Sequence, residues 1–342
     1  MKQKQYDTYQ TGLMHTALAY FLWGILPIYW KLIEHVGSEE ILAHRVFWSF
    51  LFMMFLIQMK KQWGQLAEVI KRMLKKPLLL LSLVLSSVLI SINWYLYIWA
   101  VNHNHILETS LGYYINPLIS VLLGMIFLKE RLNKWQYASF GLAAAGVLFM
   151  TIQYGKFPFV AIVLALSFGF YGLTKKVTKL DASIGLTLET LMVMPAALIY
   201  IFSIAAKGQS AFFDWSPATN AFLIGAGIVT AVPLLLFAKG AQHIPLFMVG
   251  ILQYIAPTIT LLLGVLVYNE SFSGTEMITF SLIWSALVLF SFSHVKGSAW
   301  KWKKRKQWNC RKACPCARLF SFIEMNFRYT IRLAGRVEED EF

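Results

Sequence analysis

The sequence predicts an all-α polytopic membrane protein with about ten transmembrane helices in two inverted five-helix repeats. Three observations lead to this prediction: an unusually apolar composition, ten apolar runs of membrane-spanning length, and an internal repeat. Hydrophobic residues make up 58% of the 342 residues and charged residues only 14%, whereas soluble proteins carry about 25% charged residues. Too few polar side chains remain to cover a surface that faces water.

The apolar runs are expected to be helices, because a helix satisfies all its backbone hydrogen bonds within lipid. A span needs roughly 20 apolar residues to cross about 30 Å of hydrocarbon. The first run follows a polar segment and continues to Trp30, which favours a spanning helix over a cleaved signal peptide. The expected spans are residues 13–33, 41–59, 77–101, 107–128, 137–152, 158–174, 185–204, 221–238, 246–268 and 277–293.

Lysines and arginines in the short loops predict the orientation, because cytoplasmic loops retain cations. With the N-terminus inside, the inner segments ahead of the tail carry 15 of these residues and the outer loops carry 2, Lys156 and Lys207. Both termini are therefore expected to be cytoplasmic. The net charge of +14 is explained by this topology, so no nucleic-acid partner is expected.

An internal repeat relates the two halves of the chain. Because five is an odd number of spans, the second unit enters the membrane from the opposite side, and such inverted repeats place a transporter's substrate site where they meet. The expected units are residues 1–152 and 153–295, followed by a basic tail, 296–342. A shift of 140 residues aligns His103 with His243, Tyr114 with Tyr254, Pro117 with Pro257, Gly124 with Gly264 and Glu130 with Glu270.

Ionisable residues inside spans are costly and are candidate functional groups. Arg45, with His44 beside it, and Glu108 fall near the outer face, whereas Glu189 falls near the inner face. At 1.5 Å per residue, about 15 Å of membrane separates Arg45 from Glu189. Arg45 is therefore expected to pair with Glu108 and close the outer mouth. Glu189 is expected to serve the inner half, with a proton as the candidate coupling ion. The alternative is that Arg45 and Glu189 extend to the lipid head groups.

Amide and aromatic side chains form a second candidate group. They can stack on a flat organic solute and hydrogen-bond to it, although aromatic belts at the membrane interface explain some of them. Pro117 and Pro257, with Gly124 and Gly264 two turns on, predict paired kinks or close helix contacts. The candidates are Asn93, Trp94, Tyr97, Tyr114, Asn116, Gln253 and Tyr254.

Two basic segments lie outside the spans. Residues 60–76 are expected to form a short amphipathic helix on anionic lipid. The tail is expected to be reduced and cytoplasmic, and its Cys310, Cys314 and Cys316 do not match a strong zinc spacing. The sequence holds no phosphate-binding glycine loop, nucleophile elbow or His-Glu zinc motif, so neither a metal nor a cofactor is expected.

Several motifs resemble those of a known family. They are Trp23-Gly24-Ile25-Leu26-Pro27, Ala43-His44-Arg45-Val46-Phe47-Trp48-Ser49, Ser110-Leu111-Gly112-Tyr113-Tyr114-Ile115-Asn116-Pro117, Glu189-Thr190 and Gln253-Tyr254-Ile255-Ala256-Pro257. These segments are similar to those of the RarD group of EamA-type carriers, in the drug/metabolite transporter superfamily. The resemblance runs from about residue 12 to residue 292. It implies a carrier in a bacterial plasma membrane, with ten helices in two inverted units.

The favoured function is secondary transport of a small organic solute, a drug or a metabolite, by alternating access. The alternative is a scaffold that transports nothing, or a membrane-embedded enzyme. An enzyme would need acids or histidines clustered on one face, whereas the ionisable residues of this chain are split between the two ends of the membrane. Membrane lipid is an expected partner. The solute, its direction, the coupling ion and a homodimeric assembly stay open.

Overall fold

The computed structural model describes residues 2–103, 105–212, 216–268 and 273–304. All regular secondary structure in these residues is α-helical. The three cysteines of the tail, Cys310, Cys314 and Cys316, lie outside the described residues. The helices are α1 (Lys2–Lys31), α2 (Ser38–Met59), α3 (Trp63–Lys75), α4 (Pro77–Asn102), α5 (Ile106–Phe127), α6 (Lys134–Tyr154), α7 (Phe159–Thr178), α8 (Ala182–Ala206), α9 (Pro217–His243), α10 (Leu246–Gln253), α11 (Ile255–Leu266) and α12 (Gly274–Lys304).

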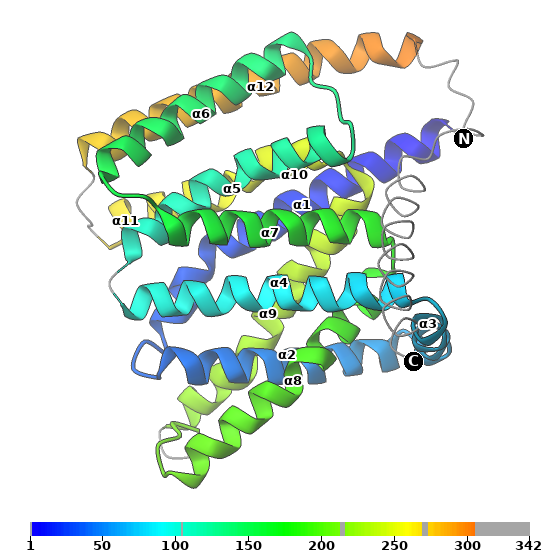
Figure 1. Cartoon of the computed structure of the whole chain (residues 1–342), viewed down its shortest axis with the longest axis vertical. Coiled ribbons are helices and arrows are strands. Elements are labelled where there is room, and N and C mark those ends of the chain that lie inside the picture. Colours follow the sequence, from blue (N-terminus) through cyan, green and yellow to red (C-terminus); the bar gives the residue numbers. More distant parts are fainter. Residues whose placement is uncertain (1, 104, 213–215, 269–272, 305–342) are drawn as a thin grey trace, which may run out of the picture.

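Ten stretches of these helices are long and apolar enough to cross a membrane. This confirms the predicted all-α polytopic fold, and the observed bounds differ from the expected ones mainly by a few residues at the helix ends. In Figure 1 the long helices run across the view, and successive ones run in opposite directions. The chain therefore visits the two ends of the bundle in turn.

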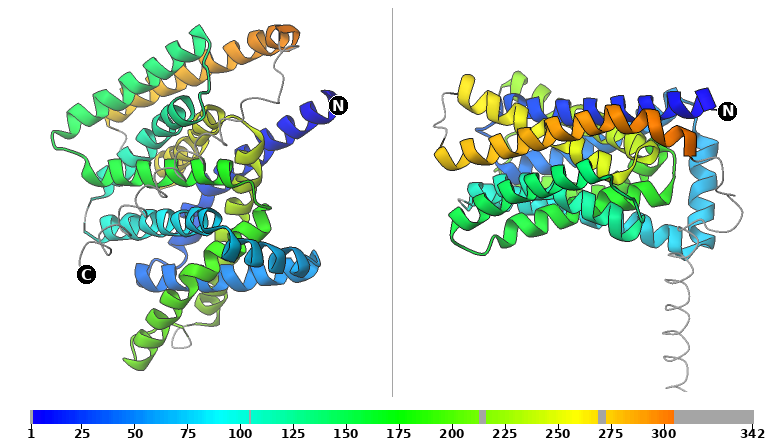
Figure 2. Two further views of the ribbon diagram at one scale, coloured as in Figure 1. Left: turned by 45° about the vertical axis from the view of Figure 1, so that its right-hand side comes forward. Right: turned by 90° about the horizontal axis from the view of Figure 1, so that it is seen from above.

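The short helix α3 lies at the end of the bundle that also holds the N-terminus, and it runs across the direction of its neighbours (Figures 1 and 2). Its Leu66, Val69 and Met73 are buried against Ile57 of α2, Leu83 of α4 and two residues of α8. Its cations Lys71 and Arg72 are exposed. The predicted amphipathic helix is thus present and packs on the ends of three spans.

The ninth span, expected over residues 246–268 with Pro257 as a candidate kink, is not one continuous helix. It is divided into α10 and α11, which meet at Tyr254. Pro257 explains the break, because a proline ring clashes with the carbonyl four residues earlier, here that of Gln253. Pro117, at the matching position of the first repeat, lies within the continuous helix α5. The helix is therefore divided at the second proline of the pair only, while the first lies at a close helix contact: a Cβ at Gly250 of α10 would lie 2.7 Å from the Pro117 carbonyl oxygen.

Helices of the first half pack mainly on helices of the second half. Counterparts under a five-span repeat pack on each other in the pairs α2–α8, α5–α10 and α6–α12. Other contacts occur as matching pairs: α1–α9 matches α4–α7, and α2–α9 matches α4–α8. This is the pattern that a two-fold repeat predicts, and it brings several helices of each half into contact with the other half.

Two glycines of α9 allow close helix crossings. A Cβ at Gly227 would overlap the backbone of Trp48 on α2 and lie 2.6 Å from the Ser49 nitrogen. The Ser49 hydroxyl also donates to the Gly227 carbonyl at 2.9 Å. A Cβ at Gly240 would lie 2.8 Å from the Thr16 nitrogen of α1. Small residues let spanning helices approach closely, so α9 is held against both α1 and α2.

Candidate functional site

The loop between α7 and α8 positions the first cluster of charged side chains. Lys179 ends α7 with a left-handed backbone, φ 50°, and the Asp181 carboxylate accepts from the amides of Ser183 at 2.9 Å and Ile184 at 3.3 Å. An aspartate at this position satisfies amides that the first helical turn leaves free. The short turn brings the last residues of α7 beside the first turns of α8.

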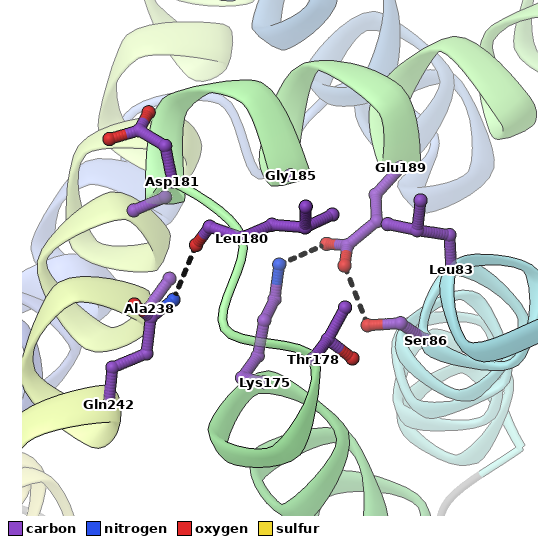
Figure 3. A pocket seen from close by; sticks show the side chains of 11 residues that line it. Leu83, Ser86, Lys175, Thr178, Leu180, Asp181, Gly185, Glu189, Ala238 and Gln242 are labelled. Carbon is purple, nitrogen blue, oxygen red and sulfur yellow. Dashed lines mark hydrogen bonds and ion pairs between the residues drawn. The ribbon is translucent and has the colours of Figure 1, made fainter. Parts of the chain in front are cut away.

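This turn places Lys175 of α7 opposite Glu189 of α8 (Figure 3). The Lys175 ammonium lies 2.6 Å from Glu189 Oε2, and the Ser86 hydroxyl of α4 donates to Glu189 Oε1 at 2.6 Å. The Tyr171 hydroxyl donates more weakly to Oε2, at 3.4 Å. Glu189 is only 3% exposed and Lys175 6%. The carboxylate therefore joins three helices as a buried ion pair and does not extend to the head groups.

The space beside this ion pair is small. It is bounded by residues of α4, α7, α8 and α9 and of the turn between α7 and α8, with Asp181 and Gln242 on the side away from Glu189 (Figure 3). The volume open to the centre of a water molecule is about 10 Å³, which holds about one water. A solute does not fit there in this conformation, so the bundle is closed around Glu189.

Arg45 of α2 forms the second cluster. Its Nε donates to the Thr230 hydroxyl of α9 at 3.0 Å. Its guanidinium carbon lies 4.7 Å from the ring centre of Trp30 on α1 and 5.2 Å from that of Trp94 on α4. Aromatic faces attract cations at such distances. The guanidinium is thus held between two indole rings, and Arg45 itself is partly exposed.

Tyr97 and Tyr113 extend this aromatic cluster. Their phenol groups lie within electrostatic range of Arg45, and their rings are 5.9 Å apart between centres. His44 faces another way: its Nδ1 accepts from the Trp48 indole at 3.2 Å. Trp94 and Tyr97, both predicted as site residues, therefore join Arg45, whereas the adjacent His44 does not.

The predicted pair of Arg45 with Glu108 is not formed in this structure. Glu108 instead accepts from the Tyr154 hydroxyl at 2.8 Å and from the Val160 amide at 3.0 Å, and it lies 2.9 Å from His105 Nδ1. Val160 is in the first turn of α7, where free amides and the helix dipole attract a carboxylate. Glu108 therefore binds the start of a neighbouring helix, while Arg45 faces α1 and α9.

The remaining amide candidates link helices. Asn93 donates from Nδ2 to the Leu164 carbonyl at 2.9 Å and to the Ser167 hydroxyl at 3.0 Å, which ties α4 to α7. Gln253 Oε1 accepts from Ser120 at 3.1 Å, which ties α10 to α5. Asn116 Oδ1 is buried and has no hydrogen-bond partner among the described residues.

The two tyrosines of the repeat meet at the contact of α5 with the ninth span. The Tyr254 hydroxyl donates to the Tyr114 carbonyl at 3.4 Å. The Tyr114 ring packs edge-on against Phe280 of α12, with the ring centres 5.2 Å apart. Both tyrosines are buried, so in this conformation they pack in the core.

Comparison with known proteins identifies the family. The model of the EamA-like transporter family matches residues 10–152 and again residues 156–292. The chain belongs to this family. The ten candidate spans indicate a multi-pass membrane protein, and the family membership indicates a transporter. The predicted resemblance to EamA-type carriers is confirmed.

Relatives of this EamA-family transporter cover most of its length. It is 54% identical to the uncharacterized transporter YojE of Bacillus subtilis, over 87% of this chain and 98% of the relative. It is 45% identical to protein RarD of Escherichia coli, over 83% of this chain and 95% of the relative. A crystal structure matches with a TM-score of 0.63 at 16% identity, covering 83% of this chain and 98% of the other, which shows the fold alone.

Sequence reasoning missed four partners in this transporter: Lys175, Ser86, Thr230 and Trp30. Lys175 was one of several loop cations and gave no separate signal. The hydroxyl partners did leave a signal, because the 144-residue shift that carries Arg45 onto Glu189 also carries Ser86 onto Thr230. Following the charged positions through the repeat would therefore have found both hydrogen bonds.

Proposed function

We propose that this chain carries a small organic solute across a bacterial plasma membrane by alternating access. Two five-helix units of inverted topology, residues 1–152 and 153–295, move against each other around a site between them.

The equivalence of the two charged clusters is the observation that carries this proposal. Arg45 of α2 binds a hydroxyl on α9, and Glu189 of α8 binds a hydroxyl on α4. The two hydrogen bonds are related by one 144-residue shift, and the helix contacts α2–α9 and α4–α8 match under the same repeat. The two clusters lie toward opposite ends of the bundle. In alternating access by inverted repeats, each repeat closes one end of the bundle in turn. Each end would then hold one such cluster.

The buried ion pair of Lys175 with Glu189 serves as the inner closure. Opening the bundle at this end separates two charges that lie 2.6 Å apart, which is costly unless one charge is neutralised. A proton on Glu189 would remove its charge and release Lys175. This supports the proton as the coupling ion.

Glu189→Gln tests this coupling. The amide keeps the shape of the side chain but cannot titrate, so proteoliposomes with this variant should lose accumulation driven by a pH gradient while retaining part of the solute exchange. The measurement is uptake of labelled solute with and without the gradient. Accumulation with the pH dependence of the wild type would show that coupling lies elsewhere.

The solute can be found by profiling metabolites in cells that lack or overproduce the protein, followed by flux measurements in proteoliposomes. We expect at least one solute to change in opposite directions in the two strains and to cross liposomes only when the protein is present. If no metabolite level changes in either strain and no solute crosses the liposome membrane, transport is rejected and the non-transporting scaffold becomes the better explanation.

The inverted topology has its own test. In a variant without native cysteines, single cysteines at Gly37 and Ser273, both at the expected outer end and exposed, should react with an impermeant thiol reagent in intact cells. A cysteine at the exposed Gly64 of α3 should react only after the membrane is opened. A reactive Gly64 position with a protected Ser273 position would contradict the orientation.

A further inference from the structure

Arg45 has no acidic partner among the described residues. Its contacts there are the Thr230 hydroxyl and the faces of Trp30 and Trp94. Two buried acids of this end are engaged elsewhere: Glu40 accepts from the Ala211 amide at 2.8 Å, and Glu108 accepts from the Tyr154 hydroxyl and the Val160 amide. Glu189, the carboxylate at the equivalent position of the other half, is paired with Lys175.

An arginine carries five N–H donors in a planar fork, and here only the Nε donor is engaged within the described part of the chain. The two terminal nitrogens are therefore free to donate to another group. Such a fork matches the two oxygens of a carboxylate. Since a charge inside a spanning segment is costly, an anion at this place would be bound strongly.

The surroundings of the guanidinium favour a planar apolar group next to that anion. Trp30 comes from α1, Trp94 and Tyr97 from α4, and Tyr113 from α5. Tyr97 is 36% exposed and Tyr113 48%, so their rings are accessible beside the cation. Aromatic side chains hold flat rings by stacking and edge contacts.

We propose that Arg45 binds the carboxylate of the transported solute, and that the solute is an organic monoanion with a planar apolar group. This inference rests on the proposed transport function and names its substrate class. One guanidinium neutralises one negative charge, whereas a phosphate monoester carries about −1.5 to −2 at pH 7. The structure shows no second free cation in this cluster among the described residues, so the carboxylate is favoured over the phosphate.

The test compares phenylacetate with its neutral amide, phenylacetamide. Affinities for the purified full-length protein in detergent are taken from the rise of the thermal midpoint with ligand concentration. We expect phenylacetate to bind at least about tenfold more tightly than the amide. Arg45→Gln should weaken phenylacetate by about 30-fold and leave the amide unchanged. Arg45→Lys keeps the charge without the fork, and it should fall between wild type and Arg45→Gln.

Arg72→Gln is the matched control, because Arg72 lies on the exposed face of α3, paired with Glu68, and its loss should change neither affinity. If Arg45→Gln does not fold, Arg45→Lys alone decides: an acid-to-amide ratio as large as that of wild type contradicts the proposal. Equal binding of acid and amide, no binding of the acid, or an equal midpoint shift with sodium chloride also overturns it.

Flux separates this inference from the transport function. Binding of phenylacetate through Arg45 without any flux in proteoliposomes would reject transport and retain the anion site. Flux of neutral or cationic solutes, with no carboxylate bound, would retain transport and reject the anion site.

Discussion

Lys175→Met is expected to destabilise the protein by about 3–5 kcal/mol, because it leaves the Glu189 carboxylate buried without its counter-ion. The carboxylate is 3% exposed, so water reaches it poorly. Ser86 supplies one hydrogen bond, which cannot replace a full positive charge. A lower thermal midpoint in detergent and a reduced yield of monodisperse protein measure the effect.

The double variant Lys175→Met with Glu189→Leu should recover most of that loss. Buried ion pairs replaced by apolar residues of similar size are often as stable as the original. Lys179→Met removes the same charge from an exposed position in the next turn and should have little effect. If Lys175→Met is as stable as Lys179→Met, the ion pair does not hold this end of the bundle closed.

Gly227→Ala should be among the most damaging single substitutions in the spanning helices. The added Cβ would meet the backbone of Trp48 and the Ser49 nitrogen at 2.6 Å, and backbone atoms cannot rotate away as the end of a side chain can. Overpacking typically costs about 1–3 kcal/mol, and we expect the upper end here. The separation of α2 from α9 should also break the hydrogen bond from Arg45 to Thr230.

Gly141→Ala is the matched comparison for this effect. Gly141 lies within α6, and a Cβ there would meet nothing within 4 Å. Alanine favours a helix over glycine by roughly 0.5–1 kcal/mol, so this variant should be neutral or slightly stabilised. Thermal midpoints of both variants, measured in one detergent, decide the matter. Similar thermal midpoints of the two variants would show that the close crossing of α2 and α9 is not needed for the stability of the protein.

The spans could be predicted because length and composition alone decide which segments cross a membrane. The break at Tyr254 had a visible cause in Pro257, although Pro117 shows that a proline does not always divide a helix. The contact partners of charged residues were harder to predict. The position of Arg45 and Glu108 within their spans predicts their depth in the membrane, but it does not predict how each helix is rotated about its axis.

The rotation of the helices decides the partners of both Glu108 and Arg45. Glu108 faces the first turn of α7, and Arg45 faces α9, so two residues at similar depth do not meet. Lys175 could not be separated from its neighbours Lys176 and Lys179 by sequence, because all three fit the cytoplasmic end of a span. Only the fold of the turn between α7 and α8 shows which of them reaches Glu189.

Arg45 has no counter-ion within the part of the chain that the structure describes, and this has an electrical consequence. The Lys175–Glu189 pair is neutral as a unit, so the charge at Arg45 is not balanced by its surroundings. A bound monoanion would cancel it, and the loaded carrier would then move no net charge through this region. One elementary charge is worth about 2.3 kcal/mol per 100 mV. A membrane potential would therefore act less on a carrier that holds the anion alone than on the empty carrier or on one that also holds a proton at Glu189.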